Sequence, residues 1–132
     1  MGRIAALVII VTALIQVSLT AHHSSALYDS NKPIAIEGVI TSVKWMNPHS
    51  RITMDVTDTQ GNTVMWVLET VSPAQFASRA APSLLKPGVK IIAKGPGPRK
   101  ADEHILLLMD FGLDGKSYHP GRAGAREGRP GE

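Results

Sequence analysis

The stretch WMNPHS, residues 45–50, separates two segments in which apolar and polar residues alternate. Pro48 has no backbone N–H and a fixed φ, and Asn47 before it is biased away from helical conformations. This dipeptide therefore favours a turn between two strands. Before the turn, the alternation slips by one residue at Gly38, which is typical of a β-bulge. We expect one long, bent strand over residues 34–45.

After the turn, the sequence predicts a β-hairpin. Apolar residues alternate through 50–57 and again through 63–69, and residues 58–62 between them have turn chemistry (DTQGN). With this turn, the numbers of paired residues sum to about 119. His49 and Glu69 are then expected at the same end of the sheet, within side-chain reach of each other.

The second half of the chain predicts a helix, two strands and a tail. SPAQ, residues 72–75, is a capping box with proline at the first helical position, which predicts a short helix over 73–80. Apolar residues then predict strands at 89–95 and 104–111. The composition beyond them changes to glycine, arginine and proline, so residues 115–132 are expected to be disordered.

Five strands with one short helix between the third and fourth predict a mainly β domain. The long, bulged first strand favours a small five-stranded OB-like Greek-key barrel, and an open sandwich of four or five strands is the alternative. The expected organisation is a signal peptide at 1–21, an N-terminal arm at 22–33, the barrel at 34–114 and the tail at 115–132.

The N-terminus has the features of a secretory signal peptide. A positively charged start is followed by the apolar run Ile4–Leu19 and then by Ala21. We expect cleavage after Ala21, which places the rest of the chain in the periplasm or outside the cell. An uncleaved membrane anchor is the alternative. The chain has no cysteine, which excludes disulfides, thiolate chemistry and cysteine-based metal sites.

The composition does not indicate nucleic-acid binding or catalysis. The net charge of +3 includes four arginines near the two ends of the chain: Arg3, Arg122, Arg126 and Arg129. Trp45 and Trp66 could stack on bases or sugars, but their phase on the strands favours the core. No nucleophile–base pair or phosphate-binding loop is visible. We therefore expect a protein or small-ligand partner, no nucleic acid, and a membrane contact only if the signal segment is uncleaved.

Four segments together resemble a family of small secreted bacterial proteins classified as a domain of unknown function. They are His22-His23-Ser24, Gly38–Trp45 running into Asn47-Pro48-His49, Trp66–Glu69 and Leu85–Gly88. The similarity covers residues 22–115. It implies a secreted, barrel-like domain and carries no established activity.

The histidines provide a candidate metal site. After cleavage, His22 would carry a free α-amine beside its imidazole, and these two nitrogens can chelate Cu(II), with His23 or His49 as a further ligand. Glu69 is expected to orient His49 from outside the ligand set. The alternative is a solvated arm and a surface ion pair. His104 is expected at a strand edge, and His119 in solvent.

The leading functional hypothesis is an exported, non-enzymatic ligand- or partner-binding module that binds Cu(II) or another divalent metal. The alternative is a purely structural or protein-interaction module of the cell envelope, without a metal.

Overall fold

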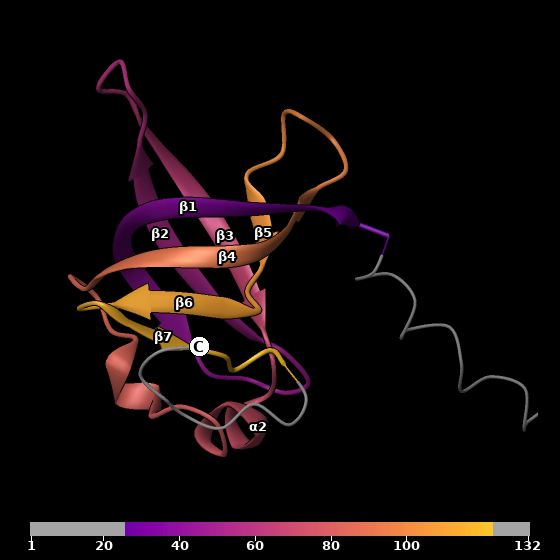
Figure 1. Cartoon of the computed structure of the whole chain (residues 1–132), viewed down its shortest axis with the longest axis vertical. Coiled ribbons are helices and arrows are strands. Elements are labelled where there is room, and N and C mark those ends of the chain that lie inside the picture. Colours follow the sequence, from indigo (N-terminus) through magenta and orange to yellow (C-terminus); the bar gives the residue numbers. More distant parts are fainter. Residues whose placement is uncertain (1–25, 123–132) are drawn as a thin grey trace, which may run out of the picture.

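A computed structural model describes residues 26–122 of the chain. Seven strands form one sheet in the order β5-β3-β2-β1-β4-β6-β7 (Figure 1). β3 and β5 run parallel, and the other neighbours run antiparallel. The elements are β1 Tyr28–Lys44, β2 Ser50–Thr57, β3 Thr63–Thr70, α2 Pro73–Ala77, η1 Pro82–Leu84, β4 Lys90–Pro98, β5 Ile105–Leu107, β6 Asp110–Leu113 and β7 Lys116–Tyr118. The mainly β prediction is confirmed, with one short α-helix between β3 and β4.

The prediction of a five-stranded barrel is wrong, because the sheet has seven strands and is not closed. The apolar run 104–111 predicts one strand but forms two. β5 pairs with β3, and the N–H of Leu108 donates to the Glu69 carbonyl at 2.8 Å. The next N–H, that of Met109, donates to the Lys94 carbonyl at 3.0 Å, and β6 then pairs with β4. A continuous apolar run does not reveal this change of partner strand.

β1 is longer than expected, since Tyr28–Pro33, predicted to be an arm, already belongs to it. It pairs first with β4 and then bends to run beside β2 (Figure 1). The register shifts lie between Asp29 and Pro33 and between Ile40 and Ser42, so the predicted bulge at Gly38 is wrong. A Cβ at Gly38 would lie 2.5 Å from the Met54 Cε and would also clash with β2 backbone. Glycine is needed there for the close approach of two strands.

The hairpin of β2 and β3 confirms the predicted strands, with a register one residue from the expected one. Ser50 pairs with Thr70, and Arg51 pairs with Glu69. The turn is held by Asp58, whose carboxylate accepts the N–H groups of Gln60 and Asn62 at 2.8 and 2.9 Å. Such local bonds from an aspartate side chain stabilise a tight turn.

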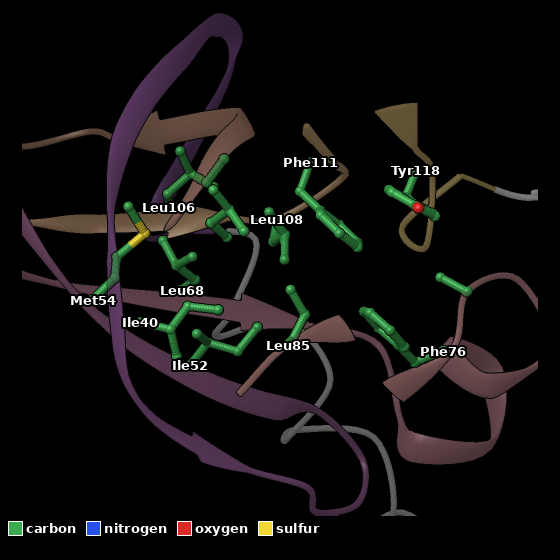
Figure 2. Close-up of a cluster of buried hydrophobic side chains, with 13 residues drawn as sticks. Ile40, Ile52, Met54, Leu68, Phe76, Leu85, Leu106, Leu108, Phe111 and Tyr118 are labelled. Atoms are coloured by element: carbon green, nitrogen blue, oxygen red, sulfur yellow. The ribbon is translucent and has the colours of Figure 1, made fainter. Parts of the chain in front are cut away.

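One hydrophobic core lies against the sheet, and Figure 2 shows its buried side chains. Phe76, on α2, is fully buried. This helix is shorter than predicted, and the hydroxyl of its cap residue Ser72 accepts a hydrogen bond from the Gln75 N–H at 3.4 Å. Trp45 meets Phe76 edge to face with ring centroids 4.9 Å apart. Trp66 also packs against the core. The core assignment of both tryptophans is confirmed.

The predicted disordered tail is wrong for residues 115–122. β7 lies there, and Tyr118 is buried against Phe111, with ring centroids 4.8 Å apart. The chain then continues to Pro120, whose carbonyl accepts a hydrogen bond from Arg79 at 2.7 Å. The glycine- and arginine-rich composition of this segment does not reveal that Tyr118 packs in the core or that the Pro120 carbonyl is hydrogen-bonded to Arg79. The predictions for residues 1–25 and 123–132 lie outside the described residues.

Among residues 26–122, no helix is long and apolar enough to cross a membrane.

Candidate metal site

The site lies at the connection between β1 and β2, at the end of the molecule where β3 also ends (Figure 1). Ser50 at the start of β2 fixes this connection. Its side chain is buried, and its N–H donates to the Val71 carbonyl at 3.2 Å. The preceding residue, His49, is thereby held just outside the sheet, with its side chain 48% exposed.

His49 and Glu69 lie side by side, as the hairpin register predicts. Nδ1 of His49 is 2.9 Å from Oε1 of Glu69, whose side chain is 17% exposed. In the described part of the chain, however, this buried oxygen receives no hydrogen bond. The two atoms are therefore close enough for an ion pair, but the ring N–H does not point at the oxygen with hydrogen-bond geometry.

Two further side chains define the electrostatics around Glu69. Burial raises the pKa of Tyr28 to about 12, the Glu69 carboxylate adds to the increase, and Arg51 opposes it. The Tyr28 phenol therefore lies within Coulombic range of Glu69. Arg51 is directly opposite Glu69 on β2. In the described residues, the ion-pair contact of Glu69 is with His49.

The position of Tyr28 bears on the two N-terminal histidines. His22 and His23 lie outside the described residues, and Tyr28 is the first residue of β1. Five extended residues span at most about 17 Å. The segment that carries the predicted ligands therefore joins the sheet at Tyr28, which pairs with Pro98 of β4 and whose phenol is within Coulombic range of Glu69.

The other two described histidines do not join this site. His104 is exposed just before β5, and its ring meets that of Trp66 with centroids 5.3 Å apart. His119, predicted to be solvated, instead lies 2.8 Å from Oδ1 of Asp110 through its Nδ1. Among residues 26–122, no group of three or more His, Cys, Asp or Glu side chains is placed to hold a metal ion.

Sequence reasoning missed the polar cluster around Asp110. Arg122 binds this carboxylate through two nitrogens, with Nε 2.8 Å from Oδ1 and a terminal nitrogen 2.6 Å from Oδ2. These bonds outweigh burial and hold the pKa of Asp110 below its usual range. The missed signal is the Asp-Gly pair at 114–115, a hairpin turn whose two residues have positive φ. Asp110 and Arg122 also line a hollow of about 630 Å³, which His49 and Glu69 do not line.

The comparisons with known proteins give a family but no activity. The sequence profile described as "Family of unknown function (DUF6152)" matches residues 10–106. This range contains His22, His23, His49 and Glu69, and it ends before the Asp110 cluster. No curated protein matches the chain at a significant level.

Proposed function

Because this chain belongs to the Family of unknown function (DUF6152), its function must be inferred from its own residues, and we propose that it is an exported, non-enzymatic module that binds a divalent metal. Copper is the proposed ion. The ligands are His22, His23 and His49, with Glu69 beside His49. The protein works in the periplasm or outside the cell.

One observation carries this proposal: the contact of 2.9 Å between His49 and Glu69. An imidazole and a carboxylate in contact are a common combination at metal sites, where the carboxylate either orients the ring or binds the metal itself. The pair lies where β1 ends and β2 begins, and the phenol of Tyr28, the first residue of β1, is within Coulombic range of the Glu69 carboxylate. His23 lies five residues ahead of Tyr28, and an extended chain spans at most about 17 Å over that separation.

The chemistry of the N-terminus favours copper. With cleavage after Ala21, His22 offers an α-amine and an imidazole in one residue, which suits a chelate of Cu(II). Imidazole binds copper, zinc and nickel, and Cu(II) has the highest affinity of these ions for nitrogen ligands. His23 or His49 supplies the next nitrogen.

The test is a competitive Cu(II) titration of the mature protein against two variants. An alanine added ahead of His22 removes the chelate, and His49→Ala removes the ring that the fold holds in place. Both changes are expected to weaken Cu(II) binding by more than about tenfold, because removal of even an outer-shell partner of a metal ligand costs about tenfold or more. His104→Ala is the matched control, because His104 is exposed and its ring packs against Trp66, away from the contact between His49 and Glu69. Equal affinity in all four proteins would overturn the proposal.

A protein-interaction role is the second candidate, and one surface feature favours it. Met65 and Val39 are 60% and 40% exposed. Both face Asp55 of β2, from β3 and β1, so they lie in one row across the outer side of the sheet. If the protein binds no metal, Met65→Lys should disrupt its association with a partner, as measured by co-purification from the exporting cell.

A further inference from the structure

We propose that Glu69 is itself a metal ligand, with its Oε1 and Nδ1 of His49 binding the same divalent cation as adjacent ligands. This inference rests on the proposed function. It changes the role of Glu69 from a group that orients His49 to a group that holds the metal.

The hydrogen bonding of Glu69 separates these two roles. A carboxylate that orients a metal-binding imidazole accepts a hydrogen bond from one ring nitrogen, while the other nitrogen binds the metal. That role requires the Nδ1–H of His49 to donate to Glu69. Oε1 lies 2.9 Å from Nδ1, yet it receives no hydrogen bond within residues 26–122. The bond on which the orienting role depends is therefore missing.

The same separation fits two atoms that share a metal. Metal–nitrogen and metal–oxygen bonds of about 2.0–2.1 Å place adjacent ligands at right angles about 2.9 Å apart. Right angles between neighbouring ligands are typical of the tetragonal geometry of Cu(II). His49 and Glu69 therefore have the spacing of a ligand pair before the metal binds.

Burial gives the carboxylate a reason to bind a cation. A buried oxygen without a hydrogen-bond donor keeps the free-energy cost of losing its water. A divalent cation bound by both Oε1 and Nδ1 would remove this cost. The oxygen would gain a bond to the metal, and the metal would take the place of the proton on Nδ1. Arg51 lies opposite Glu69 on β2, but it is exposed to solvent, and within residues 26–122 the ion-pair contact of Glu69 is with His49 and not with Arg51.

A carboxylate ligand also narrows the choice of ion. Imidazole nitrogens with a carboxylate oxygen form a mixed N/O ligand set without sulfur, and this set carries one negative charge. Such a set favours Cu(II) over Cu(I), which prefers soft thiolate and thioether ligands. We therefore expect the site to hold the oxidised ion and to lose affinity when the copper is reduced.

The experiment compares Cu(II) in the wild-type mature protein and in Glu69→Gln by electron paramagnetic resonance and by competitive titration. Glutamine has nearly the same shape and can still accept a hydrogen bond, but it lacks the charged oxygen. The inference predicts altered g∥ and A∥ values and a loss of affinity above about 100-fold, the upper limit for an orienting residue. Glu37→Gln, a surface carboxylate that pairs with Lys90 at 2.6 Å, should leave both readouts unchanged.

A measurement on the wild-type protein covers the case in which Glu69→Gln does not fold. Electron–nuclear double resonance on protein labelled with ¹³C-glutamate should show a strong ¹³C coupling to Cu(II) from a bound carboxylate. Cu(II) binding without that coupling, or with an unchanged Glu69→Gln spectrum, would overturn the direct role of Glu69 and leave the proposed function standing. No Cu(II) binding by the wild-type protein would overturn both.

Discussion

Replacement of Tyr118 by alanine should strongly destabilise the domain, because this ring belongs to the core. Tyr118 is 8% exposed, and it stacks on Phe111 with ring centroids 4.8 Å apart and planes 13° apart. Loss of a buried aromatic ring costs about 3–5 kcal/mol. β7 is a three-residue strand at the edge of the sheet and can relax around the missing ring. We therefore expect a loss of about 3 kcal/mol, the lower end of that range.

Urea and thermal unfolding followed by circular dichroism would measure this loss. For a domain of this size, about 3 kcal/mol corresponds to a fall in Tm of about 12 °C or more. Tyr118→Phe is the matched control, since it keeps the stacked ring and should stay within about 0.5 kcal/mol of the wild type. A Tyr118→Ala protein within about 1 kcal/mol of the wild type would refute the packing of β7 and favour a disordered tail.

Three further predictions concern Asp110, Gly38 and Tyr28. Asp110 has a lowered pKa because bonds from its arginine and histidine partners outweigh burial; it therefore stabilises the fold above its unfolded pKa of about 3.9 and loses this effect as the pH falls through the folded pKa. Asp110→Asn should therefore reduce the loss of stability at acid pH in a curve of unfolding free energy against pH. An unchanged curve would show that the bonds of Arg122 and His119 to Asp110 do not stabilise the fold. Gly38→Ala should cost about 1–3 kcal/mol in urea unfolding because its Cβ would clash with β2, whereas Gly112→Ala, with its nearest neighbour at 3.7 Å, should cost less. Tyr28 should ionise at about pH 12 in an NMR titration, and Glu69→Gln should lower that pKa without returning it to 10, because burial is the larger cause.

The sequence predicted those parts of the fold in which local signals and tertiary pairing agree. Alternation through 50–57 and 63–69, joined by a turn that Asp58 holds with its own side chain, was enough to set the β2–β3 register to within one residue. That register alone brought His49 and Glu69 together. The helix start at Ser72 followed from capping chemistry in the same way.

The sequence did not predict two parts of the fold. One is a segment that pairs with two different strands, and the other is a glycine- and arginine-rich segment that is held in place by contacts with the rest of the domain. Residues 104–111 pair first with β3 and then with β4, although their apolar run is continuous. β7 stays ordered because Tyr118 reaches the core and Arg122 reaches Asp110, contacts between residues that composition does not relate. The sequence predicted a role for glycine at position 38, but glycine is needed there because β1 packs closely against β2, and not because of a β-bulge.

Native mass spectrometry of the exported protein, with and without one equivalent of Cu(II), tests the central claim most directly. We predict a mature chain that begins at His22 and retains one copper ion, and a variant with one alanine ahead of His22 that does not retain it. A mature chain that begins elsewhere, or a wild-type chain beginning at His22 that holds no copper, would contradict the account.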